Sequence, residues 1–239
     1  MAPMTTALIT GANRGIGLAL CRAFLGHGVR VIAGCRQPER ATDLRTLAGK
    51  APDRLQVLSL DVTSTASVSA AAAAVSAHRQ PLDILINNAA VLLEDANAAF
   101  AGLDVEHFSD TFAVNVTGVA RVTQALLPAL LRSSQGRVVN ISSGAGSIAD
   151  RPGHMYYCYG ASKAALNHLT VGLADELRPR NVIVAAISPG WVRTDMGGPG
   201  AELPAEESAA AIAATVLRLK PEDSGCFLGR SGTREGYVW

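Results

Sequence analysis

The chain has almost no net charge and lacks a long hydrophobic run. Its 239 residues contain 21 Lys and Arg against 20 Asp and Glu, so no overall field attracts nucleic acid or an anionic membrane. No apolar stretch reaches the roughly 20 residues that a membrane-spanning helix needs. These two features predict a protein with neither nucleic acid nor a membrane as its partner.

Cysteine is scarce, and its spacing fits no common metal site. The four cysteines, at positions 21, 35, 158 and 226, form no CxxC pair, and no histidine lies at metal-ligand spacing from them. The first six residues also lack the basic start and apolar run of a secretory signal. We therefore expect reduced thiols, a cytoplasmic protein and no bound metal.

What the sequence does contain is apolar segments in a regular order. Hydrophobic residues make up 49% of the chain and charged ones 17%, as in compact globular proteins, and the length favours one domain over residues 1–239. Strands that are rich in β-branched residues alternate with helical segments, which is typical of a parallel sheet. We expect strands near residues 5–10, 29–34, 55–60, 82–87, 136–142, 181–187 and 225–228, and helices near 15–27, 37–48, 65–78, 103–132, 156–178 and 205–219.

This order of elements predicts a single-domain α/β protein with a Rossmann fold. Right-handed crossovers between the strands give a doubly wound, seven-stranded parallel sheet with helices on both faces. The long helix over 103–132 is the one that we expect to be broken. Ligands bind such sheets at the carboxyl ends of the strands, where the strand order reverses, so the candidate site lies there.

A glycine-rich loop follows the first expected strand and precedes a helical run. Its glycines allow a tight turn and a close backbone approach to a pyrophosphate, and the helix N-terminus offers free N–H groups. An ordinary strand-to-helix turn is the alternative, but the position at the first βα junction favours dinucleotide binding. The loop residues that we assign to the cofactor are Gly11, Asn13, Arg14, Gly15, Ile16 and Gly17.

The end of the second expected strand bears on the choice of cofactor. In dinucleotide-binding folds a carboxylate about 20 positions after the loop selects NAD, whereas an arginine there accommodates the 2′-phosphate of NADP. Here the strand ends at Arg36 with no carboxylate at its tip. A guanidinium clamp of Arg36, supported by Arg14 and Arg40, matches phosphate geometry; solvated surface arginines are the alternative. The sequence favours NADP(H).

Two residues in the helix expected at 156–178 point to proton-transfer chemistry. Tyr159 and Lys163 are four positions apart, so their side chains share a helix face. Neither Tyr156 nor Tyr157 has a lysine at that spacing. A phenol beside a carbonyl can supply the proton that hydride transfer requires. We expect the ammonium and an oxidised nicotinamide to lower the phenol pKa by roughly one to three units.

Together these motifs resemble the short-chain dehydrogenase/reductase family over nearly the whole chain. The resemblance implies that Asp61 and Val62 contact the adenine, and that the turn Asn87-Asn88-Ala89-Ala90 steadies the sheet beside the cofactor. Taken singly, Asp61 and Asn87 are equally compatible with helix caps or turn residues. Ala90 stands where the family usually has glycine, so we expect an ordinary backbone conformation there.

The resemblance also implies two further catalytic residues. Ser143, at the end of the strand expected over 136–142, corresponds to the serine that hydrogen-bonds the substrate oxygen, with Ser142 as the alternative. Asn115 corresponds to the asparagine of a water relay toward Lys163, and asparagine inside a helix can bend it and free carbonyl groups. The expected catalytic set is Asn115, Ser143, Tyr159 and Lys163.

A last motif, over residues 188–196, resembles the family's nicotinamide-side segment. The backbone around Val192 and the hydroxyl of Thr194 would hold the carboxamide, with Pro189 and Gly190 beside them. Candidate pocket walls are His154, Met155, Tyr156, Trp191 and Met196, although each taken singly is better explained by ordinary packing.

The resemblance implies an NADPH-dependent oxidoreductase that interconverts a ketone or aldehyde and an alcohol. Residues 190–198 and 225–230 look like the carbonyl-reductase and C-factor-like branch. Apolar helices near 103–132 and 156–178 suggest a homodimer or homotetramer, as is common in the family, and packing on their own sheet is an equal alternative. Two alternatives stay open: a 3-oxoacyl thioester reductase, which would need a basic entrance, and a cofactor-binding signalling or regulatory protein without turnover.

Overall fold

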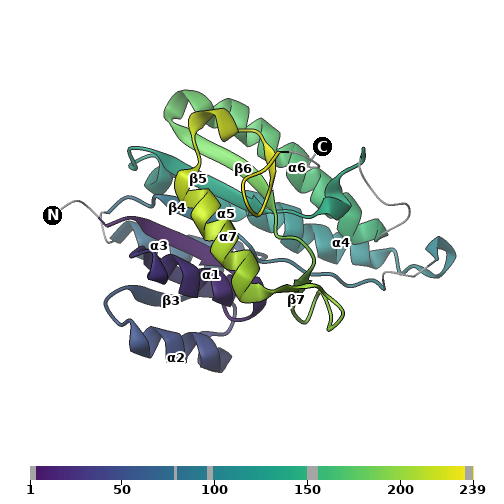
Figure 1. Ribbon diagram of the computed structural model, residues 1–239, viewed down its shortest axis with the longest axis horizontal. Helices are drawn as coiled ribbons and strands as arrows, with labels where there is room; N and C mark the ends of the chain where they lie inside the picture. Colours follow the sequence, from purple (N-terminus) through teal and green to yellow (C-terminus); the bar gives the residue numbers. More distant parts are fainter. Residues whose placement is uncertain (1–3, 78–79, 96–98, 150–155, 235–238) are drawn as a thin grey trace.

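Seven parallel strands form the central sheet of the protein. The computed structural model describes residues 4–77, 80–95, 99–149, 156–234 and 239 (Figure 1). The spatial order of the strands is β3-β2-β1-β4-β5-β6-β9, which confirms the doubly wound Rossmann topology. Their bounds are β1 (Thr6–Thr10), β2 (Arg30–Cys35), β3 (Leu55–Ser59), β4 (Ile84–Asn87), β5 (Gly136–Ile141), β6 (Val182–Ser188) and β9 (Phe227–Gly229). Each strand that the sequence predicts is present.

The strand order reverses between β1 and β4. Leu8 of β1 lies opposite Ile32 of β2 on one side and Leu85 of β4 on the other. After β1 the chain builds outward to β3 and then returns to β4 on the far side of β1. The carboxyl ends of β1 and β4 therefore border the crevice in which such sheets bind ligands.

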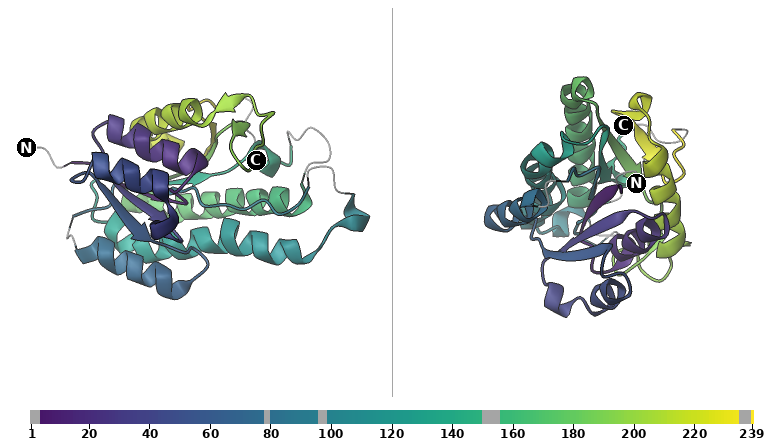
Figure 2. Two further views of the ribbon diagram at one scale, coloured as in Figure 1. Left: turned by 90° about the horizontal axis from the view of Figure 1, so that it is seen from below. Right: turned by 90° about the vertical axis from the view of Figure 1, so that its left-hand side faces the viewer.

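Helices cover both faces of the sheet, as predicted, and each face has its own apolar core. On one face lie α1 (Gly15–Gly26), α2 (Thr42–Lys50) and α7 (Ala205–Arg218). On the other lie α3 (Thr65–Ala77), α5 (Val119–Leu130) and α6 (Tyr157–Leu177), with α4 (Glu106–Phe112) packed against α6. Figure 2 shows the sheet between these two layers. Successive strand residues supply opposite cores because side chains alternate across a strand.

The long helix expected over 103–132 is interrupted, as predicted. Between α4 and α5, residues Ala113–Gly118 form a π-helical segment, a feature that often marks functional sites. Gly118, the last residue of this segment, lies close to Val62: a Cβ at Gly118 would lie 2.8 Å from Val62 Cγ2. The end of the π-helical segment therefore packs against the residues that follow β3.

Two local features differ from the expected pattern. The helix predicted from residue 37 is wrong in its first turn, because Pro38–Arg40 form a separate 3-10 turn and α2 begins at Thr42. A short parallel pair, β7 (Val192–Arg193) and β8 (Leu203–Pro204), was not predicted. Over the described ranges we find no helix with both the length and the apolar character to cross a membrane.

Candidate active site

The glycine-rich loop leads from β1 into α1 through two left-handed residues. Gly11 has a φ of 64° and Gly15 a φ of 53°, values that L side chains seldom adopt. A Cβ at Gly17 would lie 2.2 Å from the carbonyl oxygen of Gly11. The loop therefore requires glycine at all three positions, and it places the free N–H groups at the start of α1 beside the crevice.

The turn after β4 is tied to this loop by hydrogen bonds. Asn88 Nδ2 donates to the carbonyl oxygens of Thr10 at 2.9 Å and Gly11 at 3.2 Å. The hydroxyl of Thr10 accepts from the backbone N–H groups of Asn88 and Ala89, both at 3.0 Å. Ala90 does not share the positive φ that a glycine there would permit, which confirms the expected ordinary conformation. These residues form one floor of the crevice.

A buried polar chain steadies the centre of the sheet. Asn87 Nδ2 donates to Thr123 Oγ1 at 3.1 Å and to Asn140 Oδ1 at 2.9 Å. Asn140 Nδ2 in turn donates to Thr170 Oγ1 at 2.8 Å. The chain links β4 and β5 to α5 and α6, so Asn87 has a sheet-supporting position, in agreement with the resemblance.

At the other end of the crevice, the residues expected to hold the adenosine lie near one another. Val62 is buried, and Arg36 is exposed immediately after β2. Burial acts to raise the pKa of Asp61, but hydrogen bonds from Thr63 and the charges of Arg36 and Arg121 outweigh it and lower that pKa. The structure thus brings Arg36 within electrostatic reach of Asp61.

Arg14 and Arg40 are placed differently from Arg36. The Arg14 guanidinium forms an ion pair with Asp195, and both side chains are exposed. This pair joins the glycine-rich loop to the segment that follows β6, while Arg40 is exposed on the 3-10 turn after β2. Arg14 is therefore already engaged by a carboxylate in this structure.

The segment expected to face the nicotinamide is held by hydrogen bonds within itself and from α7. Pro189 accepts a hydrogen bond from Ser208 at 2.7 Å, and Gly190 has a φ of 82°. Val192 is buried in β7, and Thr194 Oγ1 accepts from the N–H of Gly197 at 3.2 Å. A Cβ at Gly15 would lie 3.2 Å from Thr194 Cγ2, so this segment closes against the glycine-rich loop.

Tyr159 and Lys163 share one face of α6, as the sequence predicts. Lys163 Nζ lies 5.4 Å from the centre of the Tyr159 ring and donates to the carbonyl oxygen of Ile141 at 2.8 Å. A side-chain hydrogen bond joins the Ser143 hydroxyl to the Tyr159 phenol. Ser143 Oγ also accepts from the N–H of Ala145 at 3.1 Å. Hydroxyl, phenol and amine thus meet at the carboxyl end of β5.

Ser143, and not Ser142, lies beside the phenol. Ser142 is buried and donates to Asn167 Oδ1 at 2.6 Å, and Asn167 Nδ2 donates to Gly146 O at 3.3 Å. Adjacent residues at a strand end point to opposite sides, which explains the contrast. The geometry favours Ser143 of the two serines that the sequence left open.

Burial shifts both ionisable groups of the catalytic helix toward their neutral forms. It raises the pKa of Tyr159 to about 12; the bond from Ser143 opposes this rise and the neighbouring Tyr156 adds to it. Burial also lowers the pKa of Lys163 to about 7. In the chain without nicotinamide the pKa of Tyr159 is therefore raised, because desolvation disfavours phenolate and weakens the charge of the lysine as well. The lowering expected beside an oxidised nicotinamide stays a prediction.

Asn115 lies in the π-helical segment with all its side-chain hydrogen bonds inside the protein. Its Oδ1 accepts from the N–H of Val91 at 2.9 Å, and its Nδ2 donates to Val91 O and to Ser162 Oγ, both at 3.0 Å. Ser162 donates to the carbonyl oxygen of Tyr159 at 2.7 Å. Asn115 is therefore linked through Ser162 to the main chain of Tyr159.

The comparison with known families agrees with this geometry. Residues 5–202 match the model of the short chain dehydrogenase family. The chain belongs to this family. The match includes the glycine-rich loop, the Asn87 turn, Ser143 and the Tyr159–Lys163 pair, so the fold and the order of the motifs are those of a short-chain dehydrogenase.

Comparison with individual relatives indicates the branch of the short-chain dehydrogenase family to which the chain is similar. C-signal of Myxococcus xanthus is 40% identical over 153 residues, which cover 64% of this chain and 91% of that protein. The NADPH-bound carbonyl reductase from chicken fatty liver superposes with a TM-score of 0.91 at 34% identity and 99% coverage of both chains. Carbonyl reductase Sniffer of D. melanogaster gives 0.93 at 30%, covering 99% of this chain and 100% of that one. These likenesses support the predicted carbonyl-reductase and C-factor-like branch.

The expected pocket walls of this short-chain dehydrogenase divide into three groups. His154 and Met155 lie outside the described residues. Trp191 and Met196 are 58% and 41% exposed on the segment around β7. Tyr156 lies beside Tyr159, because the two ring centres are 5.8 Å apart in an edge-to-face arrangement.

Sequence reasoning missed Glu94 and Ser162, which both contact the main chain of Tyr159. The carboxylate of Glu94 accepts from the N–H groups of Tyr157 at 2.8 Å and Tyr159 at 2.6 Å. A lone acidic residue between a strand and a helix looks like any surface residue in sequence. Its burial and its distant partner were visible only after folding, whereas Ser162 could have been suspected from its place between Tyr159 and Lys163.

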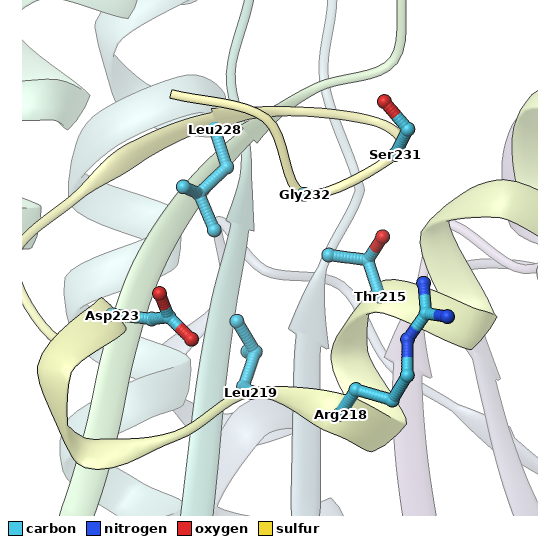
Figure 3. Close-up of a pocket in the computed structure, with 7 residues that line it drawn as sticks. All are labelled: Thr215, Arg218, Leu219, Asp223, Leu228, Ser231 and Gly232. Carbon is cyan, nitrogen blue, oxygen red and sulfur yellow. The ribbon is translucent and has the colours of Figure 1, made fainter. Parts of the chain in front are cut away.

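A separate cavity of about 170 Å³ lies between α7 and the turn after β9, away from the catalytic residues (Figure 3). Its walls are Thr215, Arg218, Leu219, Asp223, Leu228, Ser231 and Gly232.

In the part of the chain that is described, His, Cys, Asp and Glu side chains form no group of three or more that could hold a metal ion.

Proposed function

We propose that this short-chain dehydrogenase is an NADPH-dependent carbonyl reductase that interconverts a ketone or aldehyde and the corresponding alcohol. The observation that supports it most directly is the hydrogen-bonded pair of Ser143 and Tyr159 with Lys163 behind the phenol ring. The likeness to a carbonyl reductase solved with NADPH bound adds support from outside the chain.

The crevice residues fit a dinucleotide. A Cβ at Gly11 would collide with Ala89 and one at Gly17 with Gly11 O and Asn88, so glycine lets the loop turn tightly and pack against the turn after β4, as in dinucleotide-binding loops. Arg36, beside Asp61, suits a 2′-phosphate because guanidinium matches phosphate geometry. Bound NADPH supplies the hydride. The proposed cofactor residues are Gly11, Asn13, Arg14, Gly15, Ile16, Gly17, Arg36, Asp61, Val62, Asn88, Ala89, Ala90, Tyr159, Lys163, Pro189, Gly190, Val192 and Thr194.

The catalytic residues divide the proton chemistry among them. In reduction, the Ser143 hydroxyl donates a hydrogen bond to the carbonyl oxygen and the Tyr159 phenol gives it a proton. In oxidation the phenolate of Tyr159 takes the alcohol proton. Lys163, whose pKa of about 7 allows proton exchange near neutrality, replenishes the proton through a water relay beside Asn115.

The likeness to C-signal supports a second candidate, a cofactor-binding signalling protein without turnover. Binding alone would not require a phenol held against Ser143, so the carbonyl reductase is preferred. Association as a homodimer or homotetramer and a cytoplasmic location stay predictions. A 3-oxoacyl thioester is one substrate class that the following experiment includes.

The test is NADPH oxidation with a panel of aldehydes, ketones, quinones and acyl thioesters, with NADH as the control cofactor. Tyr159→Phe removes the proton donor, so we expect turnover to fall about 10²- to 10⁴-fold while NADPH binding is retained. Tyr157→Phe removes a neighbouring hydroxyl on the same helix and is expected to keep turnover. Undiminished activity in Tyr159→Phe would exclude the mechanism, and NADPH binding without turnover of any substrate would favour the signalling candidate.

A further inference from the structure

The helix that holds Tyr159 and Lys163 begins without a cap of its own. Within the described residues, the side chain of Tyr156 at the N-cap of α6 makes no capping hydrogen bond, and its φ is 49°. Bulky side chains seldom adopt such a conformation, and it persists where the surrounding structure enforces it. The first N–H groups of α6 also have no partner inside the helix, so its start depends on another segment.

Glu94, which follows β4 in the chain, provides this support. One carboxylate oxygen accepts from the N–H of Tyr157 at 2.8 Å and the other from the N–H of Tyr159 at 2.6 Å. Burial and a hydrogen bond to the same carboxylate raise the pKa of the Cys158 thiol. Glu94 is only 9% exposed. A carboxylate in this position stabilises the positive end of the helix.

The main chain of Tyr159 is held on both sides from one short segment. Its N–H is bound directly by Glu94. Its carbonyl oxygen accepts from Ser162, which is bound by Asn115, and Asn115 is fixed by both backbone groups of Val91. Residues 91–94, directly after the cofactor turn, therefore fix the peptide groups from which the phenol extends.

We propose that Glu94 is a positioning residue: it fixes the main chain of Tyr159 so that the phenol stays against Ser143. The inference rests on the proposed carbonyl reduction and adds to it a buried residue outside the expected catalytic set. Hydride and proton transfer tolerate little displacement, since a shift of about 1 Å in a reacting group can cost on the order of 100-fold in rate.

The experiment compares Glu94→Ala, Glu94→Gln and a matched control, Asp83→Ala. Asp83 is also a partly buried carboxylate with two contacts, since it accepts from the Thr6 N–H at 2.8 Å and from Ser133 Oγ at 2.6 Å. These contacts lie at the amino end of the sheet, away from the crevice. The control therefore loses a comparable pair of hydrogen bonds without touching α6.

We expect Glu94→Ala to lower kcat about 10- to 100-fold, with the NADPH dissociation constant changed less than about twofold. Glu94→Gln keeps one acceptor oxygen and is expected to lie between wild type and alanine, and it carries the test if Glu94→Ala does not fold. Asp83→Ala is expected to keep kcat even where its Tm falls equally. An unchanged kcat in both Glu94 variants, measured below their Tm, overturns the inference.

A readout without turnover separates this inference from the proposed function. In protein with ¹³Cζ-labelled tyrosine, the Tyr159 resonance is assigned by its loss in Tyr159→Phe. We expect it to shift or broaden in Glu94→Ala and to stay in place in Asp83→Ala; an unmoved resonance contradicts the inference even if wild type reduces no carbonyl. Active wild type with an inactive Tyr159→Phe and a fully active Glu94→Ala would overturn the role of Glu94 alone.

Discussion

The two ends of the crevice are built in opposite ways. At the end proposed as catalytic, Lys163 is 2% exposed and bonded to Ile141 O, and the Tyr159 phenol is bonded to Ser143. At the phosphate end, Arg36 and Arg14 are exposed, and Arg14 pairs with Asp195 across two loops. At one end the ionisable groups are buried in a low dielectric, which favours their neutral forms. At the other end the groups are charged and exposed to water.

If the proposed function holds, this difference separates catalysis from cofactor choice. Interactions in a low dielectric are strong and depend on geometry, so small displacements of Tyr159 should lower the reaction rate strongly. Exposed charges are screened by salt beyond about 10 Å and tolerate movement. Variants at the catalytic end should therefore change turnover, and variants at the phosphate end should change the preference between NADPH and NADH.

The largest effect after loss of the phenol itself is expected from Lys163→Met. The variant keeps the buried apolar stem but removes the amine behind the Tyr159 ring, so proton supply to the phenol fails. We expect kcat to fall about 100-fold or more, while NADPH binding falls less. Comparable losses in kcat and in NADPH affinity would contradict the separation of the two ends.

The pH dependence of stability gives an independent test with the same variant. Burial lowers the pKa of Lys163 from 10.5 to about 7. Between these values the unfolded chain binds more protons at this site than the folded one, so the free energy of unfolding rises with pH from about 7 to 10. Lys163→Met should remove this rise. Parallel urea-unfolding profiles of the two proteins over that range would show that the amine is not buried as described.

We expect the single substitution Arg36→Asp to change the cofactor preference. The substitution removes the guanidinium and adds a negative charge near Asp61, so we expect NADPH binding to weaken about 10- to 100-fold and NADH binding to change little. Arg180→Asp makes the same charge change at the far end of α6 and serves as the control. Equal losses for NADPH and NADH in Arg36→Asp would refute the phosphate clamp.

Contacts between neighbours in sequence were predictable, and contacts between distant segments were not. The strands follow from apolar, β-branched segments that alternate with helical ones, and the shared face of Tyr159 and Lys163 follows from the 3.6-residue period of a helix. The bond from Glu94 to Tyr159 and the Arg14–Asp195 pair join segments that only the fold brings together. The rise of the Tyr159 pKa in the chain without cofactor was not predictable for the same reason, since burial is a property of the folded chain.

The smallest effect is expected from Asp195→Asn, which releases Arg14 from its ion pair. If Arg14 supports the 2′-phosphate, its release strengthens NADPH binding, and because exposed pairs contribute about 0–1 kcal/mol the gain should stay below about fivefold. NADH binding should not change, and the gain should vanish in 1 M salt, where charges are screened within about 3 Å. An equal, salt-independent change for both cofactors would mean that Asp195 acts on the loop between β6 and α7 and not through Arg14.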